Sequence, residues 1–352
     1  MSSLLSRHSP LRIFAVSGII SIIALGMVYV YLGLQATFLA LMLVIIELTF
    51  SFDNAIVNAR VLSTMSEFWQ RMFMTVGIVI AVFGMRIIFP ILIVMFSSGL
   101  PWDQVIQLAL NQPAKYAEVL HHAHPSIAAF GGMFLLMLAL HFFFDSTRDI
   151  QWLVRVERPL QAIGKKWMHG LVCFILLVVI VCLPTNSHPI ETAIAGFIGI
   201  AVYMLIHSVS EFFTKQHEKA EKRAGKTLQR AAMAGLASFI YLEVLDASFS
   251  FDGVIGAFAV TKDVILIAVG LGIGALWVRS LTLFIVHHKV LRTYRYLEHA
   301  AHYVIGALAC TLLFGLFYEI PETWVGIIGL SVIGAAIVSS VKDNKKDSVV
   351  SL

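Results

Sequence analysis

Charged residues are scarce in this chain: Asp, Glu, Lys and Arg make up only 13% of its 352 residues. Soluble domains usually contain about 25% charged residues, so this shortage excludes an ordinary water-soluble fold. Hydrophobic residues make up 59% of the chain instead, and the mean hydropathy is +0.87. The composition therefore predicts a protein that lies largely within a membrane.

Cysteine is rare as well. Cys173, Cys182 and Cys310 all fall in apolar stretches, where we expect buried free thiols. Their spacing indicates no disulfide framework and no thiolate metal site. The formal net charge of +4 does not indicate nucleic-acid binding, because the basic residues stand in short segments between apolar runs and form no continuous patch.

Ten apolar runs are long enough, or nearly long enough, to cross a bilayer, since a membrane helix needs roughly 17–25 residues. They lie near 13–34, 36–62, 72–96, 127–147, 169–184, 190–212, 231–258, 263–286, 299–318 and 322–341. Most Lys and Arg residues then fall in segments on one side of the membrane. The positive-inside rule identifies that side as the cytoplasmic one. We therefore expect an all-α, multi-pass protein of the cell membrane with both termini cytoplasmic and a single transmembrane domain over 1–352.

Two acidic motifs lie inside these runs, E-L-T-F-S-F-D-N at 47–54 and E-V-L-D-A-S-F-S-F-D-G at 243–253. An acidic side chain near the bilayer centre costs about 2.5–3.5 kcal/mol on insertion scales, so such residues are typical of functional sites. The polar residues of interest are Glu47, Ser51, Asp53 and Asn54 in the first motif and Glu243, Asp246, Ser250 and Asp252 in the second.

The two motifs align as a repeat. Placing Asp53 over Asp252 sets Glu47 over Asp246 and leaves a valine, at position 44, opposite Glu243. The motifs lie in the second and seventh runs, so their helices run in opposite directions. Such inverted repeats place a transporter's substrate site near the midplane. The repeats would cover about 36–147 and 231–318, with linking spans over 148–230 and extra spans at 13–34 and 322–341.

Each motif is followed by a span with one arginine, Arg86 in the first repeat and Arg279 in the second. Five acids against two arginines leave a formal charge near −3, which protonation, a bound cation or both must reduce. A divalent ion plus one proton would neutralise the set. Because the motifs offer oxygen ligands and contain no Cys or His, they favour Mn²⁺, Mg²⁺ or Ca²⁺ over Zn²⁺ or copper.

The candidate metal ligands can be arranged in two ways. Glu47 and Asp53 are six residues apart, as are Asp246 and Asp252. In a regular helix residues at this spacing lie about 120° apart around the axis. Either the helix breaks near Ser-Phe-Asp, or the later Asp of each motif pairs with an arginine and only the earlier acids bind the ion. The candidate ligands are Glu47, Asp53, Asn54, Glu243, Asp246 and Asp252, supported by Ser51, Ser250, Arg86, Arg279 and His302.

At these residues the chain resembles the TerC-like integral membrane family, which is named for a tellurium-resistance protein and includes bacterial manganese exporters. Its signature E-x-x-L-S-x-D-N appears at 47–54 with Phe50 in place of the leucine, and E-x-x-D-x-x-F-x-F-D appears at 243–252. The arginine of each following span and the Y-L-E at 296–298 are also similar, so the resemblance covers roughly 40–320. The chain would form a divergent branch with long inserts at 97–126 and 148–230.

The resemblance implies outward movement of Mn²⁺ or a related divalent ion. We therefore expect a secondary transporter that lies in the lipid bilayer and moves the metal ion across it, with metal ions and protons as its partners. Two alternatives stay open: an intramembrane aspartyl hydrolase that uses Asp53 and Asp252, and a membrane assembly factor that delivers metal to exported proteins. His121, His122 and His124, between the third and fourth spans, form a pattern that is more typical of a solvated loop than of a metal site.

Overall fold

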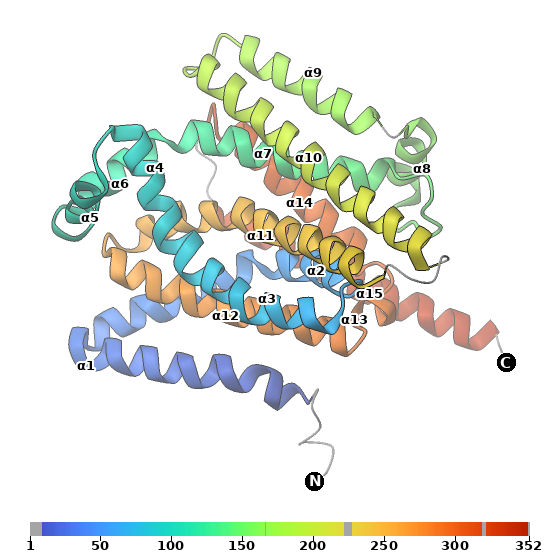
Figure 1. The fold of residues 1–352 in the computed structure, drawn as a ribbon, viewed down its shortest axis with the longest axis horizontal. Coiled ribbons are helices and arrows are strands. Elements are labelled where there is room, and N and C mark those ends of the chain that lie inside the picture. The colour runs from blue at the N-terminus through green and yellow to red at the C-terminus, as the bar shows by residue number, and fades with distance from the viewer. Residues whose placement is uncertain (1–8, 166, 222–226, 319–321, 351–352) are drawn as a thin grey trace. The chain divides into compact units, whose positions relative to one another are not determined.

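The computed structural model describes residues 9–165, 167–221, 227–318 and 322–350, and every regular element in these ranges is a helix (Figure 1). The all-helical class expected from the sequence is thus confirmed. Within α11 (Thr227–Val260) the side chains of Ser250 and Asp252 are not described, so expectations about these two lie outside the described residues.

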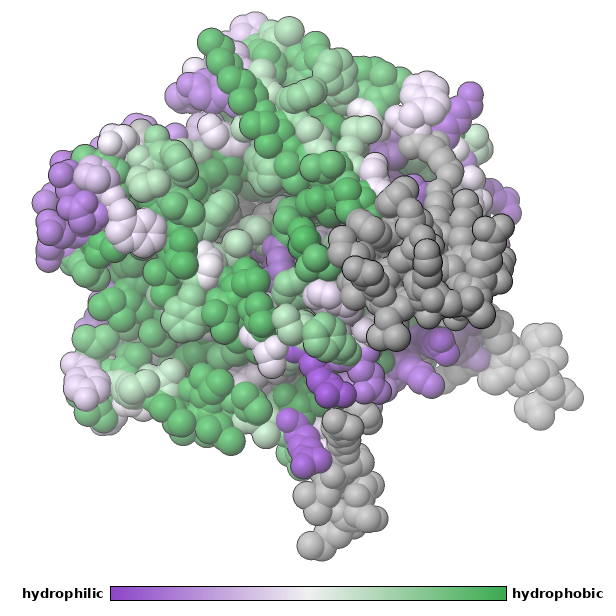
Figure 2. All heavy atoms as spheres, viewed as in Figure 1, coloured by the Kyte–Doolittle hydropathy of each residue, from purple (hydrophilic) through white to green (hydrophobic). Residues whose placement is uncertain are grey.

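Seven of the described helices are long and apolar enough to cross a membrane. The bent pair α8 (Val154–Ile163) and α9 (Met168–Cys182) would add an eighth if it forms one span. Figure 2 shows apolar side chains over much of the visible surface, as a lipid environment requires. The chain is therefore a helical membrane protein, and the ten-span arrangement stays a prediction.

The helices form two compact units. Unit 1 combines Met1–His124 with Leu242–His288 and includes the last part of α11. Its other helices are α1 (Pro10–Phe50), α2 (Phe52–Leu62), α3 (Glu67–Val79), the π-helix η2 (Ile80–Ile88), α4 (Phe89–Ser98), α5 (Trp102–Asn111), α6 (Pro113–His122) and α12 (Val264–His287).

Unit 2 combines Pro125–Tyr241 with Lys289–Leu352. It contains α8 and α9 and most of α7, which begins one residue before its boundary. Helix α7 spans His124–Phe144, and the first part of α11 also belongs to this unit. The remaining helices of unit 2 are α10 (Pro189–Glu221), α13 (Val290–Thr293), α14 (Leu297–Phe314) and α15 (Glu322–Val350).

Helix α12 is the central helix of unit 1 and packs against α1, α2, α3 and η2. Glycines on one face of α12 allow α1 to approach closely. A Cβ added to Gly270 would lie 2.5 Å from the Cβ of Leu43, and one added to Gly274 would lie 2.5 Å from the Cβ of Glu47. Small residues four apart are a common way for membrane helices to bring their backbones together. This contact places Glu47 against α12.

Helix α1 is interrupted at Gly33, whose φ of 84° and ψ of −178° are not helical. Both halves nevertheless pack on α12, because Val28 from the first half and Ala40 from the second form one buried cluster with Leu266 of α12. The outer surface of the first half of α1 is apolar, and the side chain of Ile22 there is 75% exposed. The break falls near the end of the first apolar run of the sequence analysis, 13–34, and the second run, 36–62, begins three residues later.

The first half of α1 is also bonded to α12 by serine hydroxyls. Ser17 Oγ donates to the Leu276 carbonyl at 3.1 Å and lies 2.7 Å from Ser280 Oγ. Trp277 Nε1 donates to Ser21 Oγ at 2.9 Å. These contacts cross between helices far apart in the sequence, so they fix α1 along α12 in a single register.

Replacing Gly33 with alanine is expected to destabilise the protein. Its φ and ψ lie in a region that is essentially restricted to glycine, where a side chain costs about 1–3 kcal/mol. Thermal unfolding of the purified protein in detergent should show a lower midpoint for Gly33→Ala. Gly26→Ala is the matched control, because Gly26 is helical and its added Cβ meets nothing within 4 Å. Equal midpoints for the two variants would contradict the role of Gly33.

The expectation of three buried thiols is wrong for two of them. All three cysteines are free, but only Cys173 is buried, whereas Cys182 and Cys310 are exposed on the protein surface. An apolar run in the sequence does not distinguish these cases, because the lipid-facing side of a membrane helix is as apolar as its packed side.

Candidate functional site

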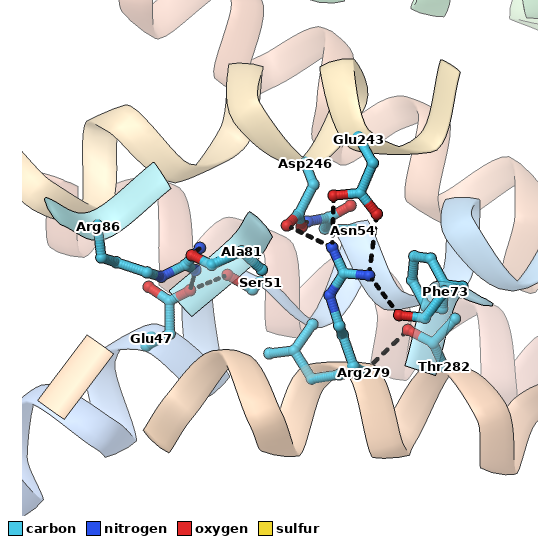
Figure 3. A network of polar contacts seen from close by, with 11 residues as sticks. Glu47, Ser51, Asn54, Phe73, Ala81, Arg86, Glu243, Asp246, Arg279 and Thr282 are labelled. Atoms are coloured by element: carbon cyan, nitrogen blue, oxygen red, sulfur yellow. Dashed lines mark hydrogen bonds and ion pairs between the residues drawn. The ribbon is translucent and has the colours of Figure 1, made fainter. Parts of the chain in front are cut away.

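The two acidic motifs meet inside unit 1. Asn54 Nδ2, from the first motif, donates to Asp246 Oδ1 of the second at 2.9 Å. On the other side, a Cβ added to Gly253 would lie 3.1 Å from Glu47 Oε2. Residues almost 200 positions apart in the chain therefore line one buried polar region, as Figure 3 shows for its hydrogen-bonded part.

The first motif is interrupted at Ser51, where α1 ends and α2 begins. Ser51 has φ of −99° and ψ of 12°, outside the helical range. Its N–H still donates to the Glu47 carbonyl at 2.9 Å, and its carbonyl accepts from the Ala55 N–H at 3.1 Å, so the chain bends without unwinding further. The second motif instead lies within the continuous helix α11. A helix break near Ser-Phe-Asp is thus found in the first motif only.

Glu47 forms a buried ion pair with Arg86. Arg86 Nη2 donates to Glu47 Oε1, and the two side chains are only 3% and 4% exposed. Arg86 Nη1 also donates to the Ala81 carbonyl at 2.9 Å within η2, while Ser51 Oγ donates to Glu47 Oε1 at 3.2 Å. Short π-helical segments inside membrane or soluble helices often occur at functional sites, and here the segment carries the arginine.

Arg279 pairs with both earlier acids of the second motif. Its Nη1 and Nη2 donate to Glu243 Oε1 and Oε2, each at 3.1 Å, in the planar two-bond geometry that favours arginine. Nη2 also donates to Asp246 Oδ2 at 3.2 Å. On α3, the Phe73 carbonyl accepts from Nη1 at 2.9 Å and the Phe73 ring centre lies 4.1 Å from the guanidinium carbon.

Asp53 has no such partner. It is 3% exposed, and among the described residues no hydrogen bond or ion pair reaches its Oδ2 atom. The alternative in which the later Asp of each motif takes the arginine is therefore wrong for Asp53, because the earlier acids hold both arginines. Asp252, its counterpart, lies outside the described side chains.

Two more oxygens on α2 lack a partner within the described part of the chain, Asn54 Oδ1 and Asn58 Oδ1. Their side chains are 2% and 1% exposed, so water does not reach them freely. Together with Asp53 they cover a sector of roughly 140° on α2 by helical geometry. Asn58 stands outside both motifs, so the motifs do not identify it as a site residue. Its position four residues after Asn54 does indicate that the two side chains share one face of a helix.

The described network has a negative formal charge. Glu47, Asp53, Glu243 and Asp246 contribute four negative charges against two positive charges from Arg86 and Arg279, which leaves −2. A buried charge without compensation is costly, so a proton or a cation is needed to reduce it. Among the described residues no three His, Cys, Asp or Glu side chains are arranged to hold a metal ion, and guanidinium groups occupy three of the four carboxylates.

His302 belongs to unit 2, whereas the described acids of the two motifs belong to unit 1. Its Nδ1 lies 2.8 Å from the Glu298 carbonyl, and its ring stacks on Phe142 with centroids 3.6 Å apart. This arrangement is typical of a neutral, hydrogen-bonded core histidine. The structure therefore does not group His302 with the other candidate residues.

A histidine cluster in unit 2 was also missed. The ring centroid of His141 on α7 lies 4.8 Å from that of His169 on α9 and 4.3 Å from that of His207 on α10. Within the described residues His141 Nδ1 has no hydrogen-bond partner. The three histidines come from different helices and share no spacing, so no sequence pattern indicates that they meet.

The fold and site define a class: a helical membrane protein whose interior contains a buried arginine–carboxylate network. The chain belongs to the family described as "Protein of unknown function (DUF475)", whose model matches residues 52–347. That range includes both arginines, the whole second motif and the first motif from Phe52 onward. Comparisons with curated proteins and with solved structures returned no match.

Proposed function

We propose that this protein is a secondary transporter that exports a divalent metal cation from the cytoplasm, with Mn²⁺ as the favoured substrate. The observation that carries the proposal is a set of three buried oxygens on α2, from Asp53, Asn54 and Asn58, that have no hydrogen-bond partner among the described residues. Asn54 also bonds to Asp246, and the described buried acids and arginines of unit 1 carry a formal charge of −2. Polar oxygens buried without partners are uncommon in native proteins and call for a specific explanation.

The ligand chemistry favours a hard or borderline divalent ion. Among the described residues the unpartnered atoms are one carboxylate oxygen and two amide oxygens, and Asp246, which accepts from Asn54, adds a carboxylate beside them. Glu47 and Glu243 are further buried carboxylates of the same unit. Such ligands suit Mn²⁺, Mg²⁺ and Ca²⁺. The resemblance of both motifs to the TerC-like family, which includes manganese exporters, favours Mn²⁺ among these ions and favours outward movement.

The proposal includes the inverted repeat and a ten-span topology with both termini in the cytoplasm of the cell. The pairing of acids with arginines supports the repeat, because Glu47 and Asp246 hold equivalent positions in the alignment and each contacts the arginine of the span that follows its motif. Glu243 has no acidic equivalent, so the site is asymmetric. Binding near the meeting point of the two motifs is what alternating access around inverted repeats requires.

Protons complete the charge balance in this proposal. With no metal ion bound, protonation of Asp53 would remove one of the two uncompensated negative charges, since this carboxylate has no cation beside it among the described residues. Metal binding would release that proton because a carboxylate ligand has to be ionised. Export would then be coupled to proton uptake from the outside.

Transport of Mn²⁺ into or out of proteoliposomes tests the proposal. The wild-type protein should carry Mn²⁺ across the bilayer, and Asp53→Asn should lower the rate by about tenfold or more, a change equivalent to ~1.4 kcal/mol. Asp103→Asn is the matched control, because Asp103 is exposed on α5.

Four outcomes would contradict this function. Wild-type vesicles that move no more Mn²⁺ than protein-free vesicles would overturn it, as would full transport by Asp53→Asn. Binding without transport would favour metal delivery to exported proteins. Cleavage of a membrane peptide that is lost in Asp53→Asn would favour the aspartyl hydrolase.

A further inference from the structure

We propose that Arg279 is a tethered counter-cation that occupies Glu243 and Asp246 while no metal ion is bound, so that the incoming ion has to displace its guanidinium group. This inference rests on the proposed function and assigns a competitor to the same site. Arg279 would thus set both the affinity for the ion and its release.

All four oxygens of these two carboxylates are engaged. Arg279 binds both oxygens of Glu243 and the Oδ2 atom of Asp246, and Asn54 Nδ2 binds the remaining oxygen of Asp246. Arg279 itself is only 2% exposed. A divalent ion cannot use these carboxylates while a positively charged group bridges them, because the two cations would share the same ligands at close range.

The guanidinium group has a second attachment that does not depend on the acids. The Phe73 carbonyl accepts from Nη1, and the Phe73 ring lies beneath the guanidinium carbon. On the same helix Gly77 leaves the space that the pair occupies, since a Cβ there would meet both Arg279 and Glu243. Arg279 can therefore leave the carboxylates and keep its contacts with α3, where a cation–π interaction offsets part of the loss.

Asn54 connects this pair to the unpartnered oxygens of α2. Its Nδ2 atom donates to Asp246, whereas its Oδ1 atom has no partner within the described residues. An ion that binds first at Asn54 Oδ1 therefore lies one side chain away from Asp246. Displacement of Arg279 would follow as a second step, in which the ion gains carboxylate ligands that the arginine gives up.

Competition between Arg279 and the metal ion for the two carboxylates lowers the apparent affinity for the ion. When the binding-competent state is only a fraction of the population, the apparent dissociation constant is the intrinsic constant divided by that fraction. Arg279 reduces the fraction of protein with free carboxylates. Removing it should strengthen Mn²⁺ binding, which is the opposite of what loss of a ligand would do, and should slow release and turnover.

The test measures Mn²⁺ binding by titration calorimetry to the purified full-length protein. Arg279→Ala should bind Mn²⁺ about tenfold or more tightly than the wild type, a shift of ~1.4 kcal/mol. Millimolar guanidinium chloride should weaken binding to Arg279→Ala by filling the space that the side chain left, and should leave the wild type unaffected. Arg279→Lys keeps the charge but not the two-bond geometry, so its affinity should lie between the other two.

A charge-matched pair keeps the test decisive if Arg279→Ala does not fold. Glu243→Gln/Arg279→Ala has the same formal charge as the wild type, and it should bind Mn²⁺ more tightly than Glu243→Gln alone. Unchanged or weaker binding in the folded variants without Arg279 would overturn the inference. A wild type that neither binds nor moves Mn²⁺ would instead overturn the proposed function, so the two failures are distinguishable.

Discussion

Gly77→Ala is expected to destabilise the protein strongly. A Cβ added to Gly77 would overlap Arg279 Nη1 and lie 2.5 Å from Glu243 Oε1, closer than real Cβ contacts come. Because both partners are buried, the methyl group would have to separate them, and breaking a buried ion pair costs about 3–5 kcal/mol. Whole domains are stable by only about 5–15 kcal/mol. We expect a large loss of monodisperse protein in detergent and a lower unfolding midpoint.

Gly84→Ala provides the matched control. Gly84 lies in η2, in the same apolar span as Gly77, but its added Cβ would be 3.5 Å from Ile80, an ordinary contact. Alanine is favoured over glycine inside helices by roughly 0.5–1 kcal/mol, so Gly84→Ala should be neutral or slightly stabilising. If Gly77→Ala behaved in the same way, the close packing of Gly77 on the ion pair would be disproved.

A double-mutant cycle on Glu47 and Arg86 should reveal strong coupling. Removing one partner leaves the other buried without its counter-charge, which costs about 3–5 kcal/mol, whereas removing both costs much less. The two single variants should also differ. Glu47→Gln changes the formal charge of the described network from −2 to −1, and Arg86→Met changes it to −3, so Arg86→Met should be the more destabilising. Thermal unfolding in detergent measures all three variants.

The exposed pair Glu67 and Arg71 is the control for this cycle. Its Oε2–Nη2 distance is 3.1 Å, but the side chains are 80% and 66% exposed. Solvent-exposed pairs of this kind contribute about 0–1 kcal/mol, so Glu67→Gln should leave the unfolding midpoint nearly unchanged. A coupling energy for Glu47 and Arg86 as small as that of the surface pair would show that burial does not strengthen it.

The helical membrane class and the two motifs could be predicted from the sequence because they depend on local patterns. A run of apolar residues and an acid within it are visible without any tertiary contact. The arginines were also expected as counter-charges, since few other cations lie within the spans. Which acid each arginine binds was not predictable from the sequence. It depends on the bend at Ser51, on the π-helix that contains Arg86, and on the close packing of α1 on the glycines of α12.

Other features of the site arise only from three-dimensional packing. The unpartnered oxygen of Asn58 becomes informative only once its burial is known, because an isolated asparagine in a helix is usually solvated or bonded. The meeting of Asn54 with Asp246 joins residues 192 positions apart. The motif alignment relates residues of the two repeats to one another. It does not predict that Asn54 on α2 contacts Asp246 on α11, because that contact depends on how the helices pack.

The serine contacts along α12 limit how unit 1 can change shape. Ser17 and Ser21 bond to Leu276, Trp277 and Ser280, which flank Arg279 on its own helix. A sliding motion of α12 that carried Arg279 away from the acids would also have to drag the first half of α1 through lipid, or break three polar bonds in an apolar medium. Rotation of the arginine side chain alone avoids both costs. The backbone around the site can therefore act as a fixed frame in which one long side chain is the moving part.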